Sequence, residues 1–114
     1  MKSYTDLEQS KKLAEILPLE SADMYYPLPC EEGDKPLLEQ GGFGSTPCWS
    51  LAALIDVLPD EVGDNHYLTL DKERNEYCCC YEDINGNSFK HTFADNPVDT
   101  CVEMIIKLHE MNLL

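Results

Sequence analysis

The segment from residue 66 to residue 94 constrains the fold most, because its side chains change to the spacing of β-strands. Three strand-like runs follow one another, at residues 67–70, 76–82 and 88–94. Asn85-Gly86 separates the last two runs, and this dipeptide is the strongest short-range signal for a hairpin. The segment therefore predicts an antiparallel β meander.

A two-residue loop at Asn85-Gly86 would set the register of that hairpin. It pairs Glu82 with Phe89, Cys80 with His91 and Cys78 with Phe93, so that all six side chains share one face. We expect this face to point to the core, with Glu82 reaching water near the turn, although two tyrosines favour the opposite face. A different loop length would exchange the faces of one strand. The register of residues 67–70 stays open for the same reason.

Helical spacing appears at both ends of the chain. Residues 5–17 carry an apolar stripe, begin with a capping box from Thr5 to Glu8 and stop at Pro18. Residues 96–109 begin with Asn96 as the cap and carry a longer apolar stripe. Both segments are therefore expected to be helices that pack on the core.

A third helix is expected in the middle of the chain. Thr46 can cap it, Pro47 suits the first helical position and Pro59 ends it. Its expected apolar stripe consists of Cys48, Leu51, Ala52, Ile55 and Leu58. Residues 22–26 are short and aromatic and precede two prolines, so they can form at most an edge strand.

This order of elements predicts an α+β fold. Helices on one antiparallel sheet form two layers, here a meander of three to four strands against about three helices. A chain of 114 residues can bury about two-thirds of its surface, which supports a core without disulfides or metal. We therefore expect residues 1–114 to form a single domain.

Acidic residues outnumber basic ones by 22 to 8, and the net charge is -14 at pH 7. Nucleic acids and anionic membranes attract Lys and Arg, so direct binding to either is not expected. The first residues lack a hydrophobic signal-peptide stretch, and no apolar run approaches the roughly 18 residues of a membrane span. The sequence thus favours a cytoplasmic protein.

The negative charge is concentrated between residues 31 and 65, where eight acidic residues accompany Lys35 alone. This region includes the irregular stretch from Pro29 to Pro47, and loops of that length are usually functional or mobile. The acidic surface could aid solubility or dock a basic protein partner. We expect a non-enzymatic interaction module, with candidate contact residues Glu31, Glu32, Asp34 and Phe43.

Six cysteines without a secretion signal are expected to be thiols rather than disulfides. Cys80 and His91 would lie about 4.5–5.5 Å apart at Cβ on the expected hairpin, close enough to bind one ion together with Cys78. No paired CxxC or HxxxH spacing supports zinc. Buried core side chains remain the alternative, so no metal or other cofactor is expected.

Cys48 offers a second chemical alternative. At the first turn of the expected middle helix, the helix dipole would lower its thiol pKa, in a manner similar to papain-like hydrolases. His66 or His91 would then serve as the base. Pro47 stands where such enzymes carry a small residue, and the surrounding carboxylates would raise the thiol pKa again. Packing on the apolar stripe is the competing interpretation.

Three stretches of the chain carry a wider resemblance. They are YTDLEQSKKLAEILPLESADMYY at residues 4–26, PCWSLAALIDVLP at residues 47–59 and DNPVDTCVEMIIKLHEMNLL at residues 95–114. The chain resembles small acidic proteins of gut Bacteroidetes and of their phages or mobile elements. The resemblance implies an accessory protein and assigns no catalytic or binding residue.

Overall fold

The meander expected from the sequence is the main sheet of the protein. The computed structural model describes residues 1–27, 33–38 and 45–114. The sheet has the order β3-β4-β5-β6 and is antiparallel throughout; its strands are β3 (Glu61–Val62), β4 (His66–Glu73), β5 (Glu76–Glu82) and β6 (Ser88–Ala94). The short edge strand β3 was not expected from the sequence.

The hairpin between β5 and β6 confirms most of the expected register. Cys80 pairs with His91 and Cys78 with Phe93, but Glu82 pairs with Ser88 instead of Phe89. The expected two-residue loop is wrong: the Asp83 amide donates to the Asn87 carbonyl (3.0 Å), which leaves three residues in the loop. Gly86 takes the left-handed conformation that such a loop requires, with φ +81°.

A β-bulge in β6 explains why the distant pairs still match. The longer loop shifts the register by one residue, and the register shift between Tyr81 and Glu82 leaves Phe89 as an extra residue on the partner strand. The two offsets cancel beyond that point. The expected pairing was therefore right for Cys80 and Cys78 although the expected loop was wrong.

The choice of inward face was wrong. Helix α3 (Pro97–Glu110) packs on the opposite face of the sheet, where Cys79, Tyr81 and Thr92 are buried. The Tyr81 hydroxyl donates to the Pro59 carbonyl (2.7 Å), which lets this large side chain enter the core with its polar atom satisfied. The face expected to be buried includes an ionisable Glu and a His, and no helix packs on it, although Cys80 on this face is buried.

The N-terminal helix is shorter than expected and starts one residue later at its cap. Helix α1 (Leu7–Ala14) has a capping box formed by Asp6 and Gln9, not by Thr5 and Glu8. Thr5 is buried instead, and its carbonyl accepts a hydrogen bond from the Tyr26 hydroxyl (2.7 Å). Thr5 therefore makes a tertiary contact instead of capping the helix, the role that local sequence had suggested for it.

The middle helix also begins later than expected. Thr46, Pro47 and Cys48 form strand β2 (Thr46–Cys48), which pairs with β1 (Met24–Tyr26) and confirms the expected edge strand. Helix α2 (Leu51–Val57) is capped by Ser50, whose hydroxyl accepts from the Ala53 amide. Its buried residues are Ala53 and Leu54, whereas the expected stripe residues Ala52 and Ile55 are exposed.

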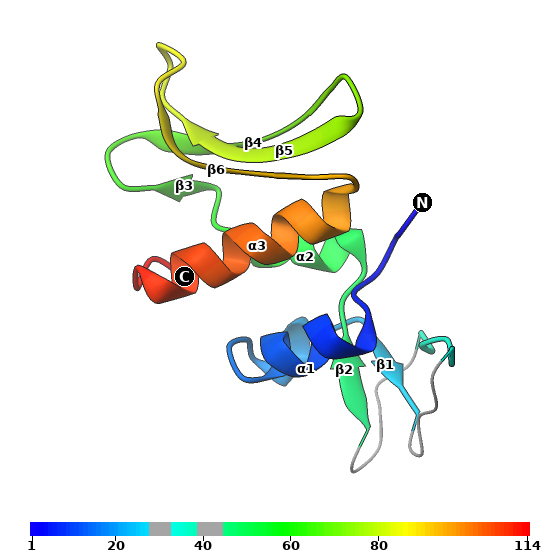
Figure 1. The fold of residues 1–114 in the computed structure, drawn as a ribbon. Helices are drawn as coiled ribbons and strands as arrows, with labels where there is room; N and C mark the ends of the chain where they lie inside the picture. Colours follow the sequence, from blue (N-terminus) through cyan, green and yellow to red (C-terminus); the bar gives the residue numbers. More distant parts are fainter. Residues whose placement is uncertain (28–32, 39–44) are drawn as a thin grey trace.

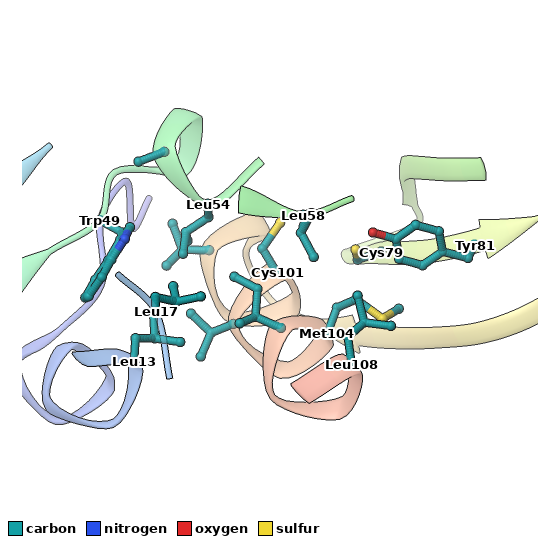
Figure 2. Packing of buried hydrophobic residues seen from close by; sticks show 14 of the residues in the cluster. Leu13, Leu17, Trp49, Leu54, Leu58, Cys79, Tyr81, Cys101, Met104 and Leu108 are labelled. Carbon is teal, nitrogen blue, oxygen red and sulfur yellow. The ribbon is translucent and has the colours of Figure 1, made fainter. Parts of the chain in front are cut away.

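Helices α2 and α3 lie between the two sheets (Figure 1). In Figure 1, α2 and α3 lie below the sheet β3–β6, while α1, the short 3-10 helix η1 (Leu19–Ser21) and the pair β1–β2 lie on the far side of them. Figure 2 shows one continuous core that runs from Trp49 and Leu13 past Leu54 and Met104 to Tyr81. The α+β class is confirmed. No helix in residues 1–27, 33–38 and 45–114 is long and apolar enough to cross a membrane.

Candidate functional site

The face of the main sheet that α3 does not touch is the candidate site, and we call it the open face. Side chains paired across an antiparallel ladder share a face, so the register assigns its members. They are Glu61 of β3; Tyr67, Thr69, Asp71 and Glu73 of β4; Glu76, Cys78, Cys80 and Glu82 of β5; and Ser88, His91 and Phe93 of β6. No element in the described part of the chain covers this face (Figure 1).

The formal charges of the open face have one sign. All of its Asp, Glu, Lys and Arg residues on the strands are acidic: Glu61, Asp71, Glu73, Glu76 and Glu82. The lysines of the same strands, Lys72 and Lys90, fall on the other side by alternation. A positively charged partner is therefore attracted to the open face, and an anionic one is repelled.

Exposed aromatic rings accompany these carboxylates. Tyr67 is 43% exposed and Phe93 is 50% exposed. The His91 ring meets the Phe93 ring edge-on, with centroids 5.2 Å apart. Aromatic residues are enriched at protein interfaces, and a group of them on one uncovered face favours an interaction surface.

One end of the open face is hollowed. A cavity of about 420 Å³ lies at the turn between β4 and β5 and is lined by Glu73, Arg74, Asn75, Glu76, Cys78 and Phe93. Glu73 is paired directly with Glu76 across the two strands. Within the described residues, neither glutamate forms a salt bridge. Arg74, which lies between them in the sequence, forms none either.

The expected metal ligands share the open face but do not form a ligand set. Cys80 is buried, and its thiol lies 3.6 Å from the Ser88 hydroxyl. Cys78 is half-buried, and His91 packs against Phe93. Across residues 1–27, 33–38 and 45–114, no three His, Cys, Asp or Glu side chains are arranged to hold a metal ion.

The thiols of the open face are also poorly suited to nucleophilic attack. Burial raises the pKa of the Cys80 thiol, and the neighbouring Glu82 carboxylate raises it further. Burial and nearby negative charges likewise raise the pKa of Cys78. Both residues are therefore thiols rather than thiolates at neutral pH.

The structure separates Cys48 from the histidines proposed as its base. Cys48 is in β2 rather than at a helix N-terminus, is fully buried and donates to the Thr5 carbonyl (3.3 Å). Burial raises the pKa of its thiol. His66 on β4 packs against Phe89 (5.5 Å), and His91 is on β6, so both lie beyond the helices from β2 (Figure 1).

The expected loop contacts can be placed only in part. Asp34 is exposed in the segment of residues 33–38, where Leu37 bridges to Tyr25. Glu31, Glu32 and Phe43 lie outside the described residues. Sequence reasoning did not select Tyr67, Glu73 and Glu76 as candidate site residues, although Tyr67, Thr69 and Asp71 alternate with Leu68 and Leu70 and mark a solvent-facing side.

Comparison with known proteins adds no assignment. No family model, no curated protein and no solved structure matches the chain.

Proposed function

We propose that this protein is a non-enzymatic interaction module that binds a basic segment of a partner protein through the open face. The observation that carries the proposal is the combination of acidic strand charges and half-exposed aromatic rings on one uncovered face. Carboxylates select the partner's charge, and the rings supply the apolar contact. A net charge of -14 speeds the approach of a cationic partner and opposes nucleic acid.

The size of the open face indicates what kind of partner fits. Seven-residue strands extend about 23 Å, and the three long strands together span about 14 Å. The area of the open face, which is the product of these two lengths, is smaller than the roughly 800 Å² that each partner contributes to a standard interface. The proposal therefore concerns an extended peptide segment held by a weak, salt-sensitive interaction.

Selection of random peptides on the immobilised protein tests the proposal. We expect enriched peptides to carry several Lys or Arg residues beside apolar ones. Their affinity should fall about tenfold for Tyr67→Ser/Phe93→Ser, because two aromatic contacts are lost. The matched control is Leu19→Ser/Leu114→Ser, which removes two exposed apolar side chains elsewhere.

Thermal denaturation of both variants establishes that each is folded. The proposal is wrong if the enriched peptides lack positive charge. It is also wrong if they bind Tyr67→Ser/Phe93→Ser as tightly as they bind the control variant.

The acidic stretch from Pro29 to Pro47 is a second candidate surface for the same class of partner. It holds four of the eight acidic residues between residues 31 and 65, and one of these four, Asp34, is exposed. If the loop carries the interaction, charge reversal at Glu31, Glu32 and Asp34 abolishes binding of the selected peptides, whereas Tyr67→Ser/Phe93→Ser does not. The two sets of variants thus separate the loop from the open face.

A further inference from the structure

We propose that the hollow at the turn between β4 and β5 is the anchor subsite for one Lys or Arg side chain of the partner. This inference rests on the proposed function and names the chemistry of its main contact. The hollow belongs to the open face, since Glu73, Glu76, Cys78 and Phe93 line it and all project on that side.

The hollow has room for a Lys or Arg side chain. Its volume of about 420 Å³ falls within the range for small-ligand sites, about 300–1,000 Å³. Its walls differ in character. Phe93 and Cys78 present apolar surface, and the two glutamates, Arg74 and Asn75 present charged or polar groups. A Lys or Arg side chain has the matching division, with an apolar stem and a charged end.

The paired glutamates supply the charge selection. Directly opposed residues of an antiparallel pair have Cβ atoms about 4.5–5.5 Å apart, and like charges there repel each other. Glu73 and Glu76 occupy such a pair, and no described residue neutralises either by a salt bridge. A cation placed between them relieves this repulsion. Arg74 lines the same hollow and leaves it with a net negative charge.

Phe93 distinguishes an organic cation from a bare metal ion. Half of its surface is exposed at the wall of the hollow. An ammonium or guanidinium group within about 6 Å of a ring is attracted to the ring face, and its stem can pack there as well. A calcium ion instead needs six to eight oxygen ligands, which two glutamates do not supply. The hollow therefore fits a basic side chain best.

Titrations followed by amide NMR test the subsite without any partner. The probes are N-acetyl-lysine amide and N-acetyl-arginine amide, and N-acetyl-norleucine amide is the uncharged control. We expect saturable shifts in residues 73–78 and at Phe93 with both cationic probes. The norleucine probe should leave these signals unchanged, because it lacks the charge that the glutamates recognise.

Paired variants assign the effect to the two glutamates. Glu73→Gln/Glu76→Gln should weaken binding of the cationic probes about fivefold or more. Glu103→Gln/Glu110→Gln, which removes two exposed charges on α3, should leave it unchanged. The first variant removes a repulsion within the hairpin, so thermal denaturation should show it folded.

Three results would overturn the subsite: no saturable shift with either cation, equal shifts with norleucine, or calcium chloride producing the same shifts at lower concentration. Each can occur while selected peptides still bind elsewhere on the open face, and the proposed function then stands without this anchor. Conversely, probe binding at the hollow combined with failed peptide selection would retain the subsite and reject the proposed function.

Discussion

At the scale of single residues, four of the five cysteines in the described residues are buried side chains rather than accessible thiols. Cys48, Cys79 and Cys101 are fully buried. A hydrogen bond to Cys101 and burial both raise the pKa of the Cys79 thiol. The sequence could place Cys79 on a strand but not on the inner face, because both faces of β5 carry a cysteine and large side chains. What decided the face was the packing of α3.

Thiol modification tests this arrangement. With iodoacetamide near neutral pH, Cys78 should react first among the five cysteines of the described residues, because the other four are buried. Cys48, Cys79, Cys80 and Cys101 should react only after denaturant is added. Peptide mapping by mass spectrometry identifies the modified sites. Rapid modification of native Cys48 would instead revive the cysteine-hydrolase alternative.

Arg74 is a strained residue at the hairpin turn. Its φ is +57°, a left-handed conformation that costs a non-glycine residue about 1–2 kcal/mol. Glycine adopts it freely but loses more chain entropy on folding, about 0.5–1 kcal/mol. Arg74→Gly should therefore raise the free energy of unfolding by about 0.5–1 kcal/mol, measured by urea denaturation. A loss of stability would show that the Arg74 side chain contributes contacts that outweigh the strain.

At the scale of elements, local signals predicted the start of α3 correctly and the start of α2 incorrectly. Asn96 caps α3 by accepting from the Asp99 amide, as expected, since nothing distant competes for it. Thr46-Pro47 fits a helix start equally well, but Pro47 pairs with Tyr25 in β1. The Asp23 carboxylate also accepts from the Ser50 amide and hydroxyl, which holds the helix start at Ser50. These partners are distant in sequence, so periodicity alone could not find them.

The true cap of α2 can be identified by substitution. Ser50→Ala should lower the free energy of unfolding by about 1–2 kcal/mol, because the cap of the Ala53 amide and the bond to Asp23 are both lost. Thr46→Ala should change it by less than about 0.5 kcal/mol, since Thr46 caps no helix. Chemical denaturation of the two variants provides the comparison. The reverse order would restore the helix start expected from the sequence.

The N-terminus joins α1 to α3 through Lys2, which contacts Asp6 (2.9 Å) and Asp99 (2.8 Å). Burial acts to raise the pKa of the Asp99 carboxyl, but hydrogen bonds, from Lys2 first, outweigh it and hold that pKa below 3.8. The pKa of the Asp6 carboxyl is also lowered, because hydrogen bonds from the Gln9 amide and from Lys2 outweigh the effect of burial. The stability that these carboxylates contribute is therefore present above pH 3.8 and is lost as the pH falls through their folded pKa values.

Asp99→Asn should accordingly be less stable than the natural protein at pH 6 and should lose less stability on acidification. Thermal unfolding at pH 6 and below pH 3.8 measures both differences. Parallel pH profiles for the two proteins would mean that Asp99 titrates alike in the folded and unfolded chains.

At the scale of the whole molecule, the two faces of the main sheet have different roles. The face that packs on α3 joins the core, which continues through the helices to Leu13, while the open face meets solvent (Figures 1 and 2). The sequence predicted the meander and the helices, which the structure confirms, and a basic partner, which stays a prediction. It could not locate the candidate site, because assigning Cys78, Cys80 and Phe93 to the core concealed the surface they share with Asp71 and Glu73.

Photo-crosslinking with a selected basic peptide tests that surface most directly. The peptide carries benzoylphenylalanine next to its Lys or Arg residues, and mass spectrometry identifies the attachment sites. Binding at the open face predicts crosslinks to β4, β5 and β6, at Tyr67 and Phe93 in particular. Crosslinks confined to α1, α3 or residues 29–47 would contradict it.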